Sequence, residues 1–177
     1  TARKNLTHFS VPFLNVEYKY ADKSNFIGLG DGTRIKLEQA SSGLQAIIPL
    51  LLVTEANTTA QNSFKNYLLI EEPELNLYPT VQKELMEFIV ERVNKSGNKL
   101  IITTHSPYIL TSLDNLIQAD NAAKANPESK DKIAEIVPVQ KWVSFDRVAC
   151  YFFEEGTCGS TLDTENQTIG ASNIDDV

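Results

Sequence analysis

Two short apolar runs joined by one helical segment constrain the fold of this chain more than any other feature. Residues 67–70 (YLLI) and 99–104 (KLIITT) have the length and continuous hydrophobicity of buried strands. Between them, Pro79 suits the first turn of a helix and Gly97 suits a left-handed cap at its end. Strand, helix and strand in direct succession make a βαβ unit, whose strands are parallel and whose crossover is right-handed. The sequence therefore predicts an α/β core.

The segment before this unit predicts a small antiparallel layer followed by a buried helix. Residues 11–20 alternate apolar and polar positions, which is typical of a half-buried strand, and residues 25–37 predict a hairpin around Gly30-Asp31-Gly32. A helix over about residues 44–55 is apolar on nearly every side, and Ser41 or Ser42 can cap its first turn. Polar residues 57–65 then predict a connector.

The segment after the βαβ unit predicts shorter elements. We expect a short helix over residues 108–117, a mobile polar insertion near 118–132, and strands at 142–143 and 147–153. A turn at Glu155-Gly156 leads toward a further extended segment and an acidic, solvated tail.

Three parts of the chain follow from these patterns. Residues 1–37 form the antiparallel β layer, residues 38–147 form the core lobe with its polar insertion, and residues 148–177 form a C-terminal hairpin with the acidic tail. The chain begins at Thr1, which suggests a fragment of something longer.

The charge and hydropathy of the chain exclude several classes of function. The 177 residues include 16 Lys and Arg against 23 Asp and Glu, giving a net charge of −7, so no overall basic field is available to bind a nucleic-acid backbone. Only residues 1–36 carry an excess of basic side chains. No apolar run approaches the length of a membrane span, and no N-terminal signal is present. With two cysteines, too few for a disulfide framework, we expect a cytoplasmic protein without a membrane partner.

Polar side chains follow both strands of the βαβ unit where each strand ends. Glu71, Glu72 and Glu74 follow one strand, and His105 follows the other. Neighbouring strands lie about 4.8 Å apart, so these groups should lie within about 5 to 10 Å of each other. One carboxylate can serve a metal ion while the next orients a water molecule and takes its proton, and the imidazole can donate to a phosphoryl oxygen.

A phosphate-binding turn precedes the first apolar helix. Ser41-Ser42-Gly43 supplies hydroxyl groups, free backbone N–H groups and the positive end of a helix dipole. Alone, this turn would be an ordinary helix cap. Together with the acidic segment and the histidine, it indicates nucleotide phosphate chemistry.

The succession LEQASSGLQ, YLLIEEPELNLYP and KLIITTHSPYIL resembles the second half of an ABC-type ATPase head, in the branch of SMC-like, RecF-like and OLD-like AAA-family ATPases. The resemblance spans about residues 37–110 and implies a P-loop NTPase-like fold. It assigns residues 40–43 to the signature motif and residues 68–71 to the Walker B strand. It assigns residues 75–78, with Asn76, to the D-loop.

The same resemblance implies the roles of individual side chains and the ligands they serve. Glu72 would be the catalytic carboxylate, His105 the switch histidine and Glu71 the ligand that supports Mg²⁺, with ATP as the nucleotide. ATP would be sandwiched in a homodimer, in which Ser41, Ser42, Gly43 and Asn76 help to bind the nucleotide and the signature serine and glycine act on the other protomer's ATP. The whole protein would couple ATP to a DNA-linked task such as repair or phage defence, with DNA or an effector nuclease as a possible partner.

Several positions depart from the family pattern. Glu71 stands where the Walker B acid is most often Asp, Ser42 stands where many signatures have a glycine, and Asn76 and Tyr78 stand where OLD-like relatives often carry histidines. No glycine of the chain is followed by Lys, so the GxxxxGK[ST] loop of a Walker A motif is absent. The chain would thus be the C-terminal lobe of a head, and by itself inactive as an ATPase.

Two other functions stay open on the residues alone. The lobe can be a structural or protein-binding module that does not use nucleotide. Less favoured is a metal-dependent nuclease built on Glu71, Glu72 and Glu74, because no further Asp or His ligand motif accompanies them.

Overall fold

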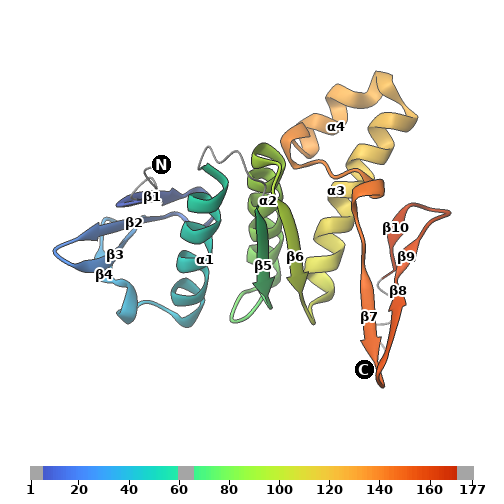
Figure 1. Cartoon of the computed structure of the whole chain (residues 1–177). Coiled ribbons are helices and arrows are strands. Elements are labelled where there is room, and N and C mark those ends of the chain that lie inside the picture. The colour runs from blue at the N-terminus through green and yellow to red at the C-terminus, as the bar shows by residue number, and fades with distance from the viewer. Residues whose placement is uncertain (1–5, 60–65, 171–177) are drawn as a thin grey trace.

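The computed structural model describes residues 6–59 and 66–170 and shows an antiparallel sheet, a parallel strand pair and a helical part arranged side by side (Figure 1). The antiparallel sheet has the order β1-β2-β3-β4, with β1 at His8–Val11, β2 at Val16–Ala21, β3 at Ser24–Leu29 and β4 at Arg34–Lys36. The predicted β3–β4 hairpin is confirmed, and Gly32 adopts the left-handed φ of 85° that its turn requires.

The prediction of one strand over residues 11–20 is wrong. Residues 12–14 form a short 3-10 helix, Pro12–Leu14, between β1 and β2, because proline donates no hydrogen bond to a strand ladder. Asn15 then takes a left-handed φ of 50° and reverses the chain. Val16 and Tyr18 are buried and Glu17 is exposed, so the predicted alternation holds over the first half of β2. It does not extend to Tyr20, which is 46% exposed.

Helix α1 (Ser42–Thr59) starts where the serines predict it and runs four residues beyond the predicted end. The Leu44 N–H donates to the Ser41 hydroxyl oxygen at 3.4 Å, as a capping serine should accept. Its last residues lie within the predicted polar connector, whose remainder, 60–65, falls outside the described residues.

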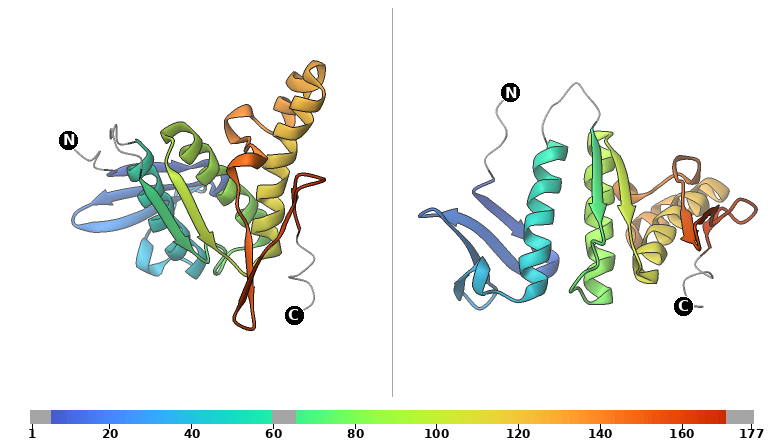
Figure 2. Two further views of the ribbon diagram at one scale, coloured as in Figure 1. Left: turned by 45° about the vertical axis from the view of Figure 1, so that its right-hand side comes forward. Right: turned by 60° about the horizontal axis from the view of Figure 1, so that its bottom comes forward.

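The βαβ unit is confirmed. Strands β5 (Tyr67–Glu71) and β6 (Lys99–Thr103) pair in parallel with Leu68 opposite Leu100, and helix α2 (Pro79–Ser96) joins them. Gly97 caps α2 with φ 67° and donates its N–H to the Val93 carbonyl. Helix α2 covers one face of the pair (Figure 2), where Leu68 and Ile70 are buried. In the described parts of the chain the parallel sheet has these two strands and no others.

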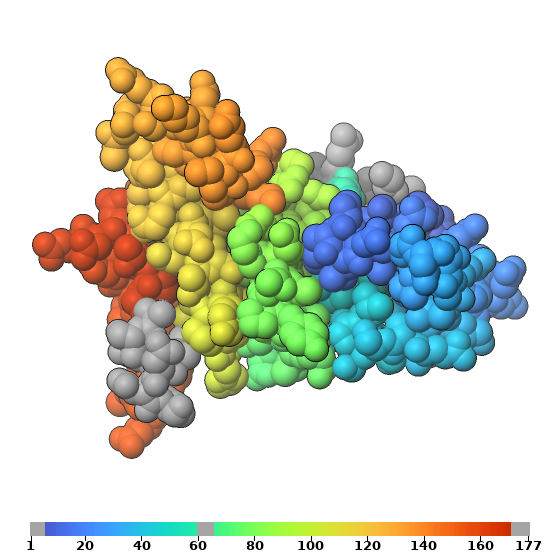
Figure 3. Space-filling model, turned by 180° about the vertical axis from the view of Figure 1, so that it is seen from behind, coloured from blue at the N-terminus to red at the C-terminus, as the bar shows by residue number. Residues whose placement is uncertain are grey.

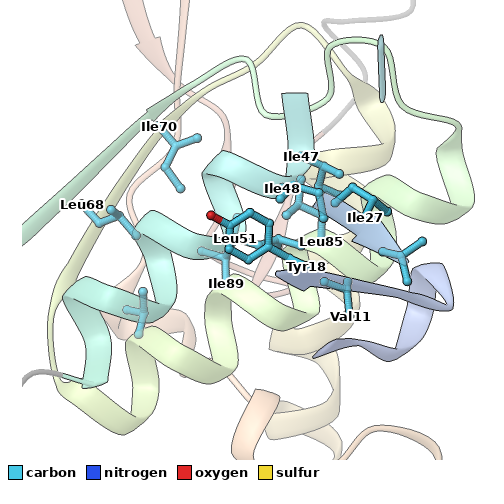
Figure 4. Close-up of a cluster of buried hydrophobic side chains, with 12 residues drawn as sticks. Val11, Tyr18, Ile27, Ile47, Ile48, Leu51, Leu68, Ile70, Leu85 and Ile89 are labelled. Carbon is cyan, nitrogen blue, oxygen red and sulfur yellow. The ribbon is translucent and has the colours of Figure 1, made fainter. Parts of the chain in front are cut away.

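The main hydrophobic core joins the antiparallel sheet to the βαβ unit through α1 and α2 (Figure 4). Ile27 of the sheet, Leu51 of α1 and Leu85 of α2 are fully buried within it. A second cluster holds α3 against the other side of α2 and contains Met86, Val90, Ile109 and Leu116.

The predicted mobile insertion near residues 118–132 is wrong, because this segment is largely helical. Helix α3 (Pro107–Ala125) continues through it, and a short 3-10 turn (Pro127–Ser129) leads into α4 (Lys130–Ile136). Leu116, Ala119 and Ala123 are buried at helical spacing, while Lys124 is exposed and pairs with the partly buried Asp120. Alanine is the strongest helix former, and the polar composition masked this one-sided apolar stripe.

The strands predicted at 142–143 and 147–153 are also largely wrong. Residues 142–143 are irregular after the 3-10 turn Val139–Lys141, and the Asn94 side chain donates to the Trp142 carbonyl at 2.9 Å. A second 3-10 turn occupies Phe145–Arg147. The Val143 N–H donates to the Leu116 carbonyl of α3 at 3.2 Å. Hydrogen bonds to α2 and α3 thus replace a strand ladder at residues 142–143.

The predicted C-terminal hairpin is confirmed. Strands β7 (Tyr151–Glu154) and β8 (Thr157–Ser160) pair across Glu155-Gly156, and β9 (Leu162–Asp163) pairs with β10 (Thr168–Ile169). These strands and α4 project from the body formed by the N-terminal layer, α2 and α3 (Figure 3). Residues 171–177 of the predicted acidic tail lie outside the described residues. Among the helices of the described residues, none is long and apolar enough to cross a membrane.

Candidate functional site

Two polar turns meet at the carboxyl end of the β5–β6 pair. The parallel register sets Glu71 opposite Thr103, and the Glu72 N–H donates to the Thr103 carbonyl at 2.8 Å. Glu72 then adopts a left-handed φ of 42°, which is uncommon for a residue with a side chain. This conformation ends the strand at once and turns the chain into the buried Pro73.

The Glu72 carboxylate and the His105 imidazole face each other across these two turns. His105 Nε2 lies 3.6 Å from Glu72 Oε1, and the side chains are 88% and 41% exposed respectively. This separation is longer than a hydrogen bond and makes an ion pair when the imidazole is protonated. The predicted proximity is therefore found, at a shorter range than strand spacing alone suggests.

Glu71 occupies a different side of the sheet from the residues under α2. Along β5, Tyr67, Leu69 and Glu71 are exposed while Leu68 and Ile70 are buried, so Glu71 lies on the face that α2 does not cover. Within residues 6–59 and 66–170, no group of three or more His, Cys, Asp or Glu side chains is arranged to hold a metal ion by itself. Mg²⁺ in nucleotide sites is bound by one or two carboxylates together with phosphate and water, and a single Glu71 fits that mode.

The serine turn lies against the segment that follows the acidic residues. A Cβ atom added to Gly43 would lie 2.8 Å from the Asn76 carbonyl oxygen, closer than real Cβ atoms approach. Asn76 itself has a left-handed φ of 61°. Ser41 and Ser42 are exposed beside Gly43. The structure thus brings the predicted signature and D-loop segments of one chain into contact, which the sequence did not predict.

Glu74 has a structural role that sequence reasoning missed. Its Oε1 accepts hydrogen bonds from the Thr104 hydroxyl at 2.7 Å and from the His105 N–H at 2.8 Å. The carboxylate that the nuclease hypothesis would use as a metal ligand is therefore engaged with the opposite turn.

Gln82 is a second residue that sequence reasoning missed. It is 7% exposed on α2, and its side-chain oxygen accepts from the Ser106 hydroxyl at 2.6 Å. The available signal was a polar residue three positions before the buried Leu85, on the apolar face of a helix.

Comparison with known families identifies the domain type. A family model described as AAA ATPase domain matches residues 2–110, which include every candidate site residue. Searches of curated proteins and of solved structures found no match. The family supports a nucleotide-hydrolysing type of domain, and the α/β arrangement with a parallel pair is compatible with it. On this match over more than half of its length, the chain belongs to the AAA ATPase domain family.

Proposed function

We propose that this chain is the C-terminal lobe of an ABC-type ATPase head of the SMC-like, RecF-like and OLD-like branch, and that it supplies the hydrolytic half of an ATP site. The observation that carries the proposal is the 3.6 Å approach of His105 to Glu72 at the carboxyl end of a parallel strand pair. Ligands of open α/β sheets bind at this end of the strands.

Each side chain of the site has one task in ATP hydrolysis. The Glu72 carboxylate, still 41% exposed, orients the attacking water and accepts its proton. The His105 imidazole donates to a γ-phosphate oxygen as negative charge develops on it. Glu71 on the open face of β5 would hold Mg²⁺, and the ion would supply neutralisation of the negative charge of the triphosphate.

A second copy of the chain completes the nucleotide contacts. The exposed Ser41 and Ser42 and the adjoining Gly43 act on ATP held by the other protomer, through hydroxyl groups and the free N–H groups of the first turn of α1. Asn76 lies against Gly43 and belongs to the same dimer surface. ATP binding would then close the homodimer.

The triphosphate cradle comes from a P-loop lobe outside the printed sequence. The open face of the β5–β6 pair supports this arrangement, because Tyr67 and Leu69 are 66% and 61% exposed on strands whose apolar sequence suits cover on both faces. The DNA-linked task, or an effector nuclease that ATP hydrolysis drives, would likewise depend on those further segments.

Glu72→Gln in the protein that unites this chain with a P-loop lobe tests the proposal. The variant should bind ATP with unchanged affinity and hydrolyse it at least about 100-fold more slowly, because the amide cannot accept the water proton. Glu135→Gln on the surface of α4 is the matched control and should keep wild-type turnover. Unchanged turnover in Glu72→Gln would contradict the catalytic assignment and favour a nucleotide-independent lobe.

A further inference from the structure

We propose that Glu74, Gln82 and Ser106 are positioning residues that hold Glu72 and His105 in catalytic register, a role that rests on the proposed ATPase function. They belong to a closed ring of hydrogen bonds that links the acidic turn after β5, the histidine turn after β6 and helix α2. Neither catalytic side chain is a member of the ring.

The ring can be followed from residue to residue. The Thr104 hydroxyl donates to Glu74 Oε1 at 2.7 Å, and the Ser106 N–H donates to Thr104 Oγ1 at 2.9 Å. The Ser106 hydroxyl donates to Gln82 Oε1 at 2.6 Å, and Gln82 Nε2 donates to the Leu77 carbonyl at 3.0 Å. The Leu77 N–H donates to the Glu74 carbonyl at 3.0 Å and closes the ring.

Part of this ring is buried, so its hydrogen bonds are protected from water. Gln82 and Ser106 are each 7% exposed, so water cannot readily replace a broken hydrogen bond between them. Ser106 also caps α3, because its hydroxyl oxygen accepts from the Tyr108 N–H at 3.2 Å. The ring therefore ties the start of α3 to the start of α2 through buried polar groups.

The ring fixes the backbone on both sides of the site. Glu74 Oε1 accepts the His105 N–H as well as the Thr104 hydroxyl, so one oxygen holds two successive residues of the histidine turn. Glu72 lies two residues before Glu74, and its own N–H is bound to the Thr103 carbonyl. Among the hydrogen bonds of the described residues, none uses the side chain of Glu72 or His105. The two side chains are thus aimed by their backbones and free to reach a substrate.

Glu74 performs this task through the position of an acceptor rather than through its charge. Its second oxygen, Oε2, is buried and has no hydrogen-bond partner among the described residues. Replacing that oxygen with an NH₂ group removes no hydrogen bond of the ring. Glutamine at position 74 should therefore preserve the site, and alanine should not.

The first experiment measures amide hydrogen exchange by NMR in the chain as printed. Glu74→Ala should speed exchange of the His105 N–H at least about tenfold, because its acceptor is gone. Glu74→Gln should stay within about threefold of wild type. Glu135→Ala is the matched control and should change nothing at His105. Unaltered His105 exchange in Glu74→Ala would overturn the ring.

The second experiment measures kinetics in the protein that unites this chain with a P-loop lobe. Glu74→Ala should lower kcat about 10- to 100-fold, as loss of a supporting shell does, and leave KM for ATP within about twofold. Glu74→Gln should restore kcat. A merely structural residue would not show this separation of kcat from KM together with rescue by the isosteric side chain.

Gln82→Met keeps the test decisive if Glu74→Ala fails to fold. Methionine keeps the side-chain length and removes both hydrogen bonds of Gln82, so a folded variant should show the same loss of kcat. Circular dichroism checks the fold of each variant.

Three kinetic results would overturn the inference. One is wild-type kcat in folded Glu74→Ala or Gln82→Met alongside slow turnover in Glu72→Gln, which leaves the ATPase proposal standing. Another is a Glu74→Gln defect as large as that of Glu74→Ala, which would place the charge of Glu74 in the chemistry. Unchanged turnover in Glu72→Gln would instead overturn the proposed function itself, together with any positioning role.

Discussion

The two sheets of the molecule differ in how their sequences match their burial. In β2 of the antiparallel sheet, Val16 and Tyr18 are buried and Glu17 between them is exposed. The strand therefore has one apolar face, which is covered at Val16 and Tyr18 and open only toward its end, where Tyr20 is 46% exposed. In β5 of the parallel pair, Leu68 and Ile70 are buried against α2, but Tyr67 and Leu69 are apolar too and are exposed.

The difference shows that the hydrophobic pattern of a strand reflects how many of its two faces are buried by other parts of a protein. Antiparallel sheets commonly leave one face in water, and their strands alternate. Strands of parallel sheets are covered on both faces and are apolar throughout. Strand β6 adds one apolar residue to the same open face, because Ile101 is 47% exposed there between the polar residues Lys99 and Thr103. The apolar face of the antiparallel sheet is mostly buried by the rest of the chain. The parallel pair, by contrast, exposes Tyr67, Leu69 and Ile101 on a face that none of the described residues covers.

Truncation on the covered face should have the largest effect. Ile70 is 6% exposed in the main core, and Ile70→Ala should lower the free energy of unfolding by about 2–4 kcal/mol through lost burial and the cavity left behind. Urea denaturation followed by circular dichroism measures it. Ile27→Ala, at a fully buried position of the antiparallel sheet, is the reference variant and should lower the free energy of unfolding by a similar amount. A loss below 1 kcal/mol for Ile70→Ala would break the contrast between the two faces.

An intermediate effect on stability is expected at Glu87 of α2, whose carboxylate forms ion pairs with Lys83 and Lys141. Burial raises the pKa of Glu87, but hydrogen bonds and charge from Lys141 and Lys83 outweigh it and hold this pKa below its ordinary value. A lowered folded-state pKa gives stability that is present above the unfolded value of about 4.3 and is lost as pH falls through the folded value.

Glu87→Gln should therefore lower the free energy of unfolding by about 1 kcal/mol at pH 7. The difference from wild type should shrink as the pH falls below about 4, because protonation then removes the charge from the wild-type side chain as well. Denaturation curves across pH 3–7 check both parts. A deficit that is constant across this range would show that the ion pairs with Lys141 and Lys83 are not its source.

The smallest effect is expected on the open face. Leu69 is 61% exposed, so Leu69→Thr in the chain as printed should change the free energy of unfolding by no more than about 0.5 kcal/mol. The same substitution in a protein that includes the P-loop lobe should cost about 1–3 kcal/mol, because the proposed cover then buries position 69. Equal effects in both proteins would mean that this face stays open.

The sequence predicted where the site lies, but it did not predict the hydrogen bonds that hold the two turns of the site together. Strand ends in a βαβ unit locate Glu72 and His105 beside each other through spacing alone, and the structure adds the distance of 3.6 Å. Glu74 and Gln82 could not be assigned in this way, because their partners, Thr104 and Ser106, lie 30 and 24 residues away along the chain. Hydrogen bonds across such separations have no periodic signature.

The sequence by itself determined the local elements whose causes are local. These local causes are Pro79 and Gly97, which begin and end α2, the serine that caps α1, and the apolar runs of β5 and β6. Each acts within a few residues, so each can be identified from the sequence without knowledge of the fold. Only the tertiary structure showed that residues 118–125 continue α3. The reason is that Ala119 and Ala123 stabilise this part of the helix when they are buried against neighbouring segments. The tertiary structure also decided which face of the parallel pair is covered and which turns the ring of hydrogen bonds joins, since both depend on contacts between distant segments.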